Sequence, residues 1–517
     1  MSYKVQKGTV YLVGAGPGDL KLITVKAKEI LEQADIIIYD NLINIRLLEC
    51  AKPNAKKIFV GKSSGKHSIP QSEINELLLN EINPNTSVVR LKGGDPLVFG
   101  RIREEINTLE TGNIPYEIVP GITAAMACAA YTGIPITERD TSSSIIFLTG
   151  HENPEKMCLN LDFREYAKEN ATLCIYMGVG QMERIVGELI EGGLKPNTPV
   201  AIVENGSTQK QKSTIGHLGT IVEKSKAQSI QAPAIIFVGS VVNLKGSQNW
   251  FENKPLFGKK IIVPRARQQA GKLTELLEFY GADVIEIPLI AISPKYDKET
   301  IADVFTELST YQWILFTSAN GVQHFFDLFF KAYEDIRSIG LSQIGVVGNA
   351  TAKAIESLHL KVDLLPESAN SDALVDALLE RESLDNTKIL IVTGNKGSPS
   401  LVKRLETEGR AIVDRLPLYE NKKCSISESP HFESFKTSGA DAILFTSSST
   451  VQNFMDSIKD LSIDPSILPA YGSIGVKTSE TLKQMGATID FESPKANLEN
   501  FVVETISYFK NKQTNNQ

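Results

Sequence analysis

The segment Leu91-Lys92-Gly93-Gly94-Asp95-Pro96-Leu97-Val98-Phe99-Gly100-Arg101 decides how the first half of the chain folds. It follows the apolar run 87–91, which is typical of a buried strand in a parallel sheet. The two glycines leave bare backbone at the strand end, where free N–H groups can bind an extended ligand. Asp95 can accept a hydrogen bond from such a ligand, and Pro96 fixes the backbone after it. The same residues also suit a strand-to-helix turn that binds nothing.

Glycine-containing turns also follow other apolar runs of the first half. One run, residues 9–13, leads into Gly14-Ala15-Gly16-Pro17-Gly18-Asp19 and then into an amphipathic helix. Three further runs lead into Pro120-Gly121-Ile122-Thr123-Ala124, Tyr176-Met177-Gly178 and Val203-Glu204-Asn205-Gly206. Short apolar strands thus alternate with amphipathic helices up to about residue 244, which predicts an α/β fold with parallel sheet.

The first glycine turn also resembles a dinucleotide-binding fingerprint, and Asp40 ends the next strand, where such folds place a ribose-binding acid. The fingerprint requires its third glycine at position 19, which is Asp19 in this chain. Pro17 also removes a backbone donor that a phosphate would use. NAD binding is therefore the weaker interpretation of this turn.

Length and composition set broad limits. A chain of 517 residues is too long for one hydrophobic core, so two or more domains are expected. Its hydrophobic content of 42% and charged content of 22% are ordinary for a soluble globular protein. The sequence contains no apolar run of membrane length and no signal peptide, which predicts a cytoplasmic protein without a membrane partner. The net charge of −7 argues against nucleic acid as a partner but is compatible with an acidic small substrate.

The cysteines and histidines show no metal-binding pattern. The five cysteines are Cys50, Cys128, Cys158, Cys174 and Cys424, and none forms a Cys-x-x-Cys pair. Their odd number and wide spacing predict reduced thiols. The six histidines lack metal-ligand spacing as well, so no metal site is expected.

Four further segments complete a family pattern, at residues 35–40, 60–62, 133–137 and 149–151. Together with the glycine turns, they resemble the tetrapyrrole methylases, and within them the uroporphyrinogen-III C-methyltransferases, over about residues 8–244. The resemblance implies two α/β subdomains with the active site in the cleft between them, and a homodimer. It also implies S-adenosylmethionine as the cofactor, without a metal.

The resemblance assigns the cofactor contacts residue by residue, to Pro17, Gly93, Gly94, Asp95, Val98, Thr123, Ala124, Met177 and Gly206. This ligand is a sulfonium cation with an adenosine and an amino acid tail, so backbone hydrogen bonds and a small apolar wall suit it. Met177 by itself would be interpreted as a core residue. Its place before Gly178 at a strand end favours a ligand contact instead.

Asp40 and Lys62 match the proton acceptor and the proton donor proposed for the family. When a pyrrole carbon has attacked the methyl group, a proton must leave the macrocycle, and a carboxylate can accept it. Asp40 is alternatively a helix N-cap, and Lys62 is alternatively a solvated loop residue. Two departures from the family pattern are Ile102-Arg103 in place of Gly-Gly and Glu138 in place of His. The second departure puts in doubt any substrate contact expected from that histidine.

Residues 245–258 lose all periodicity and are predicted to be a linker, which Trp250-Phe251 could pack down. Beyond it, the sequence repeats at an interval of about 128 residues. Ile314-Leu315-Phe316-Thr317-Ser318, for example, recurs as Ile443-Leu444-Phe445-Thr446-Ser447. The repeat predicts two similar parallel α/β lobes, each with hydroxyl and backbone donors at strand ends, where open sheets bind ligands.

The second half resembles the uroporphyrinogen-III synthases over about residues 258–508. The resemblance implies a domain at 259–510, with one lobe at about 259–292 plus 421–508 and another at about 295–418. Residues 511–517 are polar and predicted to be disordered. Tyr419 resembles the residue thought to assist departure of the substrate's hydroxyl group, and is alternatively an ordinary strand-end tyrosine. The other cleft residues implied are Arg265, Thr317, Ser318, Thr351, Thr393, Gly394, Ser447, Ser448 and Thr478.

The two resemblances together predict a bifunctional enzyme of tetrapyrrole biosynthesis, because the product of the synthase family is the substrate of the methylase family. Hydroxymethylbilane would be closed to uroporphyrinogen III with inversion of one terminal pyrrole. Uroporphyrinogen III would then be methylated twice to precorrin-2, on the branch toward sirohaem and cobalamin. The alternative is a methyltransferase fused to a non-catalytic, two-lobed tetrapyrrole-binding or regulatory module.

Overall fold

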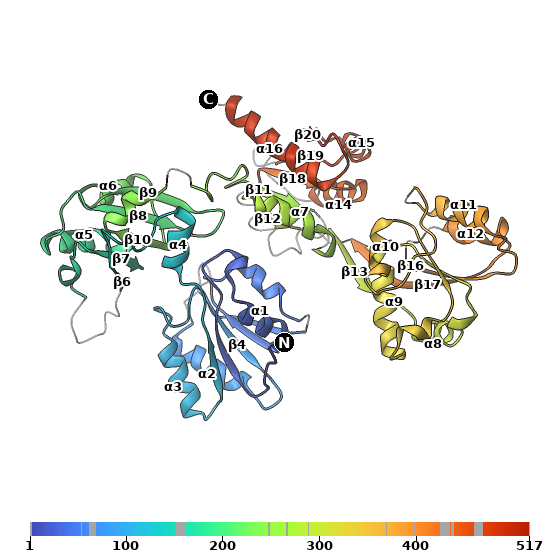
Figure 1. Cartoon of the computed structure of the whole chain (residues 1–517), viewed down its shortest axis with the longest axis horizontal. Helices are drawn as coiled ribbons and strands as arrows, with labels where there is room; N and C mark the ends of the chain where they lie inside the picture. The colour runs from blue at the N-terminus through green and yellow to red at the C-terminus, as the bar shows by residue number, and fades with distance from the viewer. Residues whose placement is uncertain are drawn as a thin grey trace. The chain divides into compact units, whose positions relative to one another are not determined.

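The computed structural model divides into two compact units, which are described separately (Figure 1). One contains Met1–Lys259 with Leu277–Asp283, and the other contains Lys260–Leu276 with Val284–Gln517. No helix in the described part of the chain is long and apolar enough to cross a membrane. The structure describes residues 3–52, 54–61, 69–150, 161–246, 249–264, 267–287, 289–368, 370–395, 397, 399–423, 435, 439–459 and 469–515.

The first sheet of the first unit is parallel throughout, with the strand order β3-β2-β4-β1-β5. Its strands are β1 (Val10–Gly14), β2 (Ile36–Tyr39), β3 (Lys56–Phe59), β4 (Val88–Lys92) and β5 (Tyr116–Val119). The helices that cover it are α1 (Val25–Gln33), α2 (Gln71–Glu81) and α3 (Ile102–Thr111).

Alternation along the strands puts helices on both faces of this sheet. Tyr11 and Val13 pack with α1 in one apolar cluster. Val10 and Leu12 pack with α2 and α3 in another. Because side chains of both faces are buried, the carboxyl ends of the strands and the loops that follow them remain the place for a ligand.

The second sheet of this unit is mixed, with the order β6-β7-β10-β8-β9. Only β6 and β7 pair in parallel among its described pairings, whereas β10 is antiparallel to β7 and β8, and β8 is antiparallel to β9. The parallel sheet predicted for this half is therefore confirmed in the first sheet and wrong for most of the second. Its strands are β6 (Ser144–Thr149), β7 (Ala171–Tyr176), β8 (Pro199–Glu204), β9 (Lys212–His217) and β10 (Ala234–Val238).

A short connection explains the antiparallel pair of β8 and β9, since a few residues can join adjacent antiparallel strands but not parallel ones. Residues 205–211 are the whole connection between β8 and β9. On one face of the sheet, α4 (Ala124–Thr132) packs against Cys174, Val203 and Phe237. On the other face, α5 (Met182–Glu191) and α6 (Leu218–Ala227) pack in a separate cluster.

The second unit contains two further sheets, as its internal repeat predicts. The strand order of one is β12-β11-β18-β19-β20, and its described pairings are parallel. Its strands are β11 (Lys260–Val263), β12 (Asp283–Glu286), β18 (Ala442–Phe445), β19 (Ala470–Ser473) and β20 (Phe491–Glu492). Its helices are α7 (Arg267–Phe279), α14 (Ser448–Lys459), α15 (Val476–Gln484) and α16 (Leu498–Asn515).

The other sheet has the order β13-β17-β16-β14-β15. Ile314 and Phe316 face one apolar cluster and Trp313 and Leu315 face another, so helices cover both sides here too. The strands are β13 (Ile290–Pro294), β14 (Trp313–Phe316), β15 (Gln343–Val346), β16 (Lys388–Gly394) and β17 (Ile412–Lys423). The helices are α8 (Lys298–Thr306), α9 (Ala319–Ala332), α10 (Asn349–Glu356), α11 (Ser371–Arg381) and α12 (Pro399–Thr407).

Two boundaries differ from those predicted for this half. Residues 290–292 and 421–423, predicted in the first lobe, pair with each other in the sheet of the second lobe, where β13 and β17 are antiparallel. The chain thus enters and leaves this lobe along two hydrogen-bonded strands, and backbone pairing carries the sheet past the predicted ends. Residues 511–515, predicted to be disordered, continue α16, whose side chains at Phe501 and Phe509 are buried.

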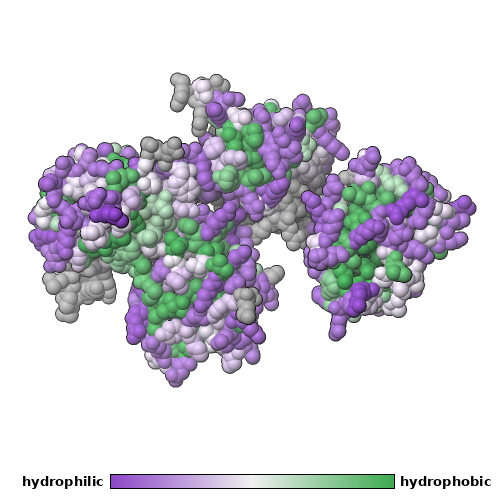
Figure 2. Space-filling model, viewed as in Figure 1, coloured by the Kyte–Doolittle hydropathy of each residue, from purple (hydrophilic) through white to green (hydrophobic). Residues whose placement is uncertain are grey.

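Short 3-10 turns connect several elements, at Leu20–Leu22, Ile45–Glu49, Phe163–Tyr166, Val179–Gln181, Ser240–Leu244, Leu308–Thr310 and Ile336–Ile339. Figure 2 shows a surface dominated by hydrophilic side chains, with hydrophobic groups gathered in separate patches. Apolar side chains of the first unit that remain exposed include Leu97, Phe99 and Met177. All three follow strand ends, so this edge of the unit carries apolar surface beside bare backbone.

Candidate active sites

The glycine turns after β1 and β4 are hydrogen-bonded to each other. Gly94 N donates to Gly16 O at 2.8 Å, and Gly16 N donates to Gly94 O at 3.2 Å. The turn after β5 is equally close, because a Cβ on Gly14 would lie 2.6 Å from Gly121 N. Three predicted ligand loops therefore meet as bare backbone at one edge of the first sheet.

Asp95 ties two of these loops together. Its Oδ1 accepts a hydrogen bond from Leu97 N at 2.8 Å, and its Oδ2 accepts one from Gly121 N at 2.9 Å. Val98 N in turn donates to Asp95 O. Each carboxylate oxygen retains a second lone pair. The side chain thus aligns the loops, and its predicted contact with a ligand would be additional to this role.

The end of β7 joins the start of α4. The hydroxyl groups of Thr123 and Tyr176 are hydrogen-bonded at 2.7 Å, and Ala125 N donates to Tyr176 Oη at 3.1 Å. Burial raises the pKa of the Tyr176 hydroxyl, which keeps it protonated. Met177, the next residue, has a φ of 53° and is 50% exposed. Thr123, Ala124 and Met177, all predicted cofactor contacts, therefore border one another.

The loop that contains Gly206 packs closely on α4. A Cβ on Gly206 would lie 2.2 Å from Cys128 Sγ, so only glycine fits at this position. Ser207 Oγ accepts a hydrogen bond from Asp19 N at 3.4 Å, which connects this loop to the turn that contains Pro17. The structure thus brings the predicted cofactor residues together on loops of both subdomains.

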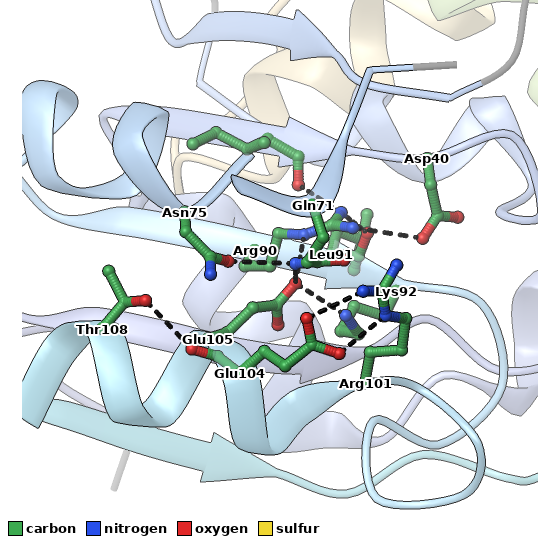
Figure 3. A network of polar contacts seen from close by, with 11 residues as sticks. Asp40, Gln71, Asn75, Arg90, Leu91, Lys92, Arg101, Glu104, Glu105 and Thr108 are labelled. Atoms are coloured by element: carbon green, nitrogen blue, oxygen red, sulfur yellow. Dashed lines mark hydrogen bonds and ion pairs between the residues drawn. The ribbon is translucent and has the colours of Figure 1, made fainter. Parts of the chain in front are cut away.

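A buried charge network joins β4, α2 and α3 (Figure 3). Glu105 on α3 is fully buried, and its Oε1 contacts Lys92 Nζ at 2.7 Å and Arg90 Nε at 3.1 Å. Gln71 Nε2 also donates to Glu105 Oε1, at 3.4 Å, whereas Glu105 Oε2 has no hydrogen-bond partner among the described residues. Burial and the neighbouring Arg90 guanidinium lower the pKa of Lys92, although Glu105 opposes this shift.

Asp40 lies at the outer end of the same network, directly after β2. Arg90 Nη2 approaches Asp40 Oδ2 at 3.5 Å, and Leu42 N donates to Asp40 Oδ1 at 3.1 Å. The carboxylate therefore caps a turn and is 27% exposed. It is not the helix N-cap of the alternative interpretation, because Asn44 caps the 3-10 helix that follows. Lys62, its predicted partner, lies outside the described residues.

In the second unit, Tyr419 on β17 meets two other predicted residues. Its Oη is hydrogen-bonded to Ser318 Oγ at 2.8 Å, and Ser318 Oγ accepts from Gly321 N at 3.0 Å as the N-cap of α9. A Cβ on Gly394 would lie 2.6 Å from the Tyr419 ring. The His324 ring lies 5.7 Å from that ring, and burial lowers the pKa of His324. The Tyr419 side chain is thus positioned by a hydrogen bond to Ser318 and by close packing of its ring against Gly394.

The remaining synthase residues are less closely grouped. Thr317 Oγ1 donates to Thr393 Oγ1 at 3.1 Å, which places Thr393 beside the Ser318 turn. Thr351 and Thr478 are both 5% exposed. Ser448 Oγ donates to the backbone of Lys477, and Ser447 Oγ caps its own turn. Arg265 lies outside the described residues.

Family comparisons identify both halves. Residues 9–222 match the family described as "Tetrapyrrole (Corrin/Porphyrin) Methylases", and residues 271–502 match "Uroporphyrinogen-III synthase HemD". "Porphyrin biosynthesis protein HemD" of Ruminiclostridium josui is 38% identical over 480 residues, which are 93% of this chain and 94% of that protein. The chain belongs to the family that joins a tetrapyrrole methylase to a uroporphyrinogen-III synthase.

Two further proteins are similar to part of the chain. "Uroporphyrinogen-III C-methyltransferase" of Bacillus subtilis (strain 168) is 40% identical over 338 residues, covering 65% of this chain and 68% of that protein. Uroporphyrin-III C-methyl transferase from Thermus thermophilus, solved with S-adenyl homocysteine, is 36% identical. It covers 46% of this chain and 95% of its own, with a TM-score of 0.40.

Several residues that contact or lie beside the predicted cofactor loops were not predicted from the sequence. Arg90, Lys92 and Glu105 form the buried charge network, and Tyr131 and Gln211 hydrogen-bond to the loops that contain Asp19 and Ser207. One signal was available, because two cations alternate in the run 87–92, which otherwise predicts a buried strand. Among the described residues, no three His, Cys, Asp or Glu side chains are arranged to hold a metal ion.

The Asp95 carboxylate provides a direct test of where the methylase domain binds its cofactor. We expect Asp95→Ala to weaken S-adenosylhomocysteine binding by about 1–3 kcal/mol, because it leaves Gly121 N and Leu97 N unpaired and frees two loops. Isothermal calorimetry on the full chain measures this loss. Asp95→Asn, which keeps one acceptor oxygen, should lose less. Unchanged affinity in Asp95→Ala would place the cofactor elsewhere.

Proposed function

We propose that this chain makes precorrin-2 from hydroxymethylbilane. Its synthase domain would close hydroxymethylbilane to uroporphyrinogen III, and its methylase domain would methylate uroporphyrinogen III twice with S-adenosylmethionine. The observation that carries the proposal is the presence of both family matches in one chain, since one family makes the substrate of the other. The product belongs to the branch toward sirohaem and cobalamin.

The proposed cofactor site consists of the strand-end loops of the methylase domain. Gly93, Gly94 and the Pro17 turn supply bare backbone, and Thr123, Ala124, Met177 and Gly206 lie on the loops that border them. Cationic sulfonium is suited to a site lined by backbone and a carboxylate rather than by basic groups. When bound, the cofactor supplies the methyl group.

Asp40 is the proposed acceptor of the proton that leaves the macrocycle, and Lys62 is the proposed donor. The position of Asp40 supports the assignment, because its carboxylate directly follows β2, at the carboxyl ends of the strands, and is 27% exposed. A homodimer formed through the methylase domain and a cytoplasmic location complete the proposal. The first rests on the family resemblance and the second on the composition.

In the synthase domain, Tyr419 is proposed to assist departure of the hydroxyl group. Gly321 N donates to Ser318 Oγ, so the Ser318 hydroxyl can donate its own hydrogen to Tyr419 Oη. The Tyr419 hydrogen is then available for the leaving oxygen. The hydroxyl group then leaves as water with the tyrosine proton, and loss of the pyrrole N–H proton leaves an azafulvene. Ring closure of the azafulvene inverts one terminal pyrrole.

Product analysis tests the proposal. The full chain is incubated with hydroxymethylbilane, with and without S-adenosylmethionine, and isomers and masses are determined. We expect uroporphyrinogen III without the cofactor and a product two methyl groups heavier with it. Formation of only the type I isomer, which arises without the enzyme, would make the second half a binding or regulatory module. Titration with S-adenosylhomocysteine and NAD separates the methylase from a dinucleotide-binding domain.

Tyr419→Phe should slow formation of the type III isomer by up to about tenfold, the effect of one lost hydrogen bond of 0.5–1.5 kcal/mol. The ratio of type III to type I isomer measures the effect, because the uncatalysed reaction continues. Ser318→Ala, which keeps the tyrosine hydroxyl, is the matched control and should be affected less. A normal isomer ratio in Tyr419→Phe would remove Tyr419 from the reaction.

A further inference from the structure

The segment between the two domains packs on the methylase unit. The Tyr131 ring lies 5.0 Å from the Trp250 ring and 4.6 Å from the Phe251 ring, and Phe251 is 3% exposed. Trp250 Nε1 donates to Ala130 O at 3.0 Å. The region predicted as a patternless linker thus supplies aromatic side chains to α4, the helix that starts at the proposed cofactor residues Thr123 and Ala124.

Tyr131 connects this aromatic cluster to the first glycine turn. Its hydroxyl donates to Asp19 Oδ2 at 2.6 Å, two residues beyond Pro17. Burial raises the pKa of Tyr131, and the hydrogen bond to Asp19 raises it further, so the hydroxyl stays a donor. Packing of Trp250 and Phe251 against the Tyr131 ring therefore helps to fix the position of the Pro17 turn.

Glu252 reaches the second cofactor loop through Gln211. Gln211 Nε2 donates to Glu252 Oε1 at 2.8 Å, and Gln211 Oε1 accepts from Ser207 N at 2.8 Å. Ser207 directly follows Gly206, and both Ser207 and Gln211 are buried. Gln211 Nε2 also donates to Tyr131 O at 3.3 Å, and Ser213 Oγ donates to Glu252 Oε2 at 3.2 Å. The contacts through Tyr131 and those through Gln211 thus both begin at residues 250–252 of the interdomain segment.

We propose that Trp250, Phe251 and Glu252 are positioning residues for the cofactor site of the methylase domain. They act through Tyr131 on the Pro17 turn and through Gln211 on the Gly206 loop. The inference rests on the proposed placement of the cofactor at these loops. It makes the interdomain segment part of the methylase site, so the functional end of this domain lies beyond residue 252 rather than at 244.

An exchange of charge across the Gln211–Glu252 contact tests the proposal in the full chain. Gln211→Glu replaces the donor opposite Glu252 with a second carboxylate, and the two negative charges repel each other. We expect this repulsion to raise the Kd for S-adenosylhomocysteine by about tenfold or more. Adding Glu252→Gln restores a donor opposite the new carboxylate and should recover most of the affinity, while Glu252→Gln alone should have little effect. Wild-type affinity in Gln211→Glu, or no recovery in the double variant, would overturn the proposal.

Steady-state kinetics separates positioning from general stabilisation. In Gln211→Glu, the KM for S-adenosylmethionine should rise while kcat and the KM for uroporphyrinogen III stay near wild type. A fall in kcat of about tenfold, with an unchanged KM for the cofactor, would overturn the proposal. Asp95→Ala, titrated in parallel, separates the proposed location of the cofactor site from the proposed positioning role of residues 250–252. If Asp95→Ala binds normally, the cofactor site itself is misplaced; if only Gln211→Glu binds normally, the positioning role alone is wrong.

Discussion

Asp40→Asn should lower the rate of methyl transfer by about 10²- to 10⁴-fold, the usual contribution of a general base. Asparagine keeps the shape of the side chain and an oxygen that accepts from Leu42 N, but it cannot accept a proton from the macrocycle. Affinity for S-adenosylhomocysteine should be unchanged, because none of the hydrogen bonds of Asp40 reaches the glycine turns. Spectroscopic detection of precorrin-2 measures the rate, and calorimetry measures the affinity.

Asp35→Asn is the matched control, because Asp35 immediately precedes the strand that Asp40 follows. Burial raises the pKa of Asp35, but hydrogen bonds from Lys52, Lys7 and Ser87 outweigh it and lower the pKa overall. The Asp35 variant should therefore lose stability and keep its rate per folded molecule. If both variants lose activity equally, or if Asp40→Asn keeps a normal rate, Asp40 is only the cap of its turn.

Glu105→Ala should destabilise the methylase unit by about 3–5 kcal/mol, the typical cost of leaving a buried charge without its partner. The substitution leaves the side chains of Arg90 and Lys92, 4% and 6% exposed, without the carboxylate they share. The chain has two tryptophans, one in each unit. Guanidinium unfolding followed by Trp250 fluorescence in a Trp313→Phe background therefore reports on the unit that contains Glu105.

Lys92→Met is the control for this prediction, because it leaves one cation for one carboxylate. It should change stability by less than about 1 kcal/mol, since buried ion pairs contribute little net stability. The Lys92 pKa lies below its ordinary value of 10.5, so the folded state loses its proton first. The free energy of unfolding of the wild type should therefore increase relative to that of Lys92→Met as the pH rises toward 10.5. Equal damage from both substitutions would show that lost packing, not charge imbalance, is the cause.

The strand ends and their glycines could be predicted from the sequence because they depend on local properties. Gly94 has a φ of 69°, which favours glycine, and Gly14 lies too close to Gly121 for a side chain. Apolar runs predicted several strands of both units, among them β1, β4 and β5 in the first and β14 and β18 in the second, and the repeat predicted two lobes. Ser318 was predicted at the synthase site. It directly follows the strand-end residue Thr317 and is the N-cap of α9.

Tertiary structure alone decided which distant residues meet. Glu105 shares no local pattern with Arg90 and Lys92, and their contact exists because α3 packs across the face of β4 that carries both cations. The antiparallel pairs of β10 likewise follow from where the strand inserts, since a buried antiparallel strand and a buried parallel strand have the same apolar composition.

The interdomain segment shows the same limit most clearly. Residues 249–252 have no period because they form neither a helix nor a strand; single side chains anchor them to sites far away in the chain. Trp250 binds a carbonyl 120 residues earlier, and Glu252 binds a side chain 41 residues earlier. Periodicity reports the repeating geometry of helices and strands, so the sequence by itself determined those elements and their turns, while contacts between single side chains required the folded chain.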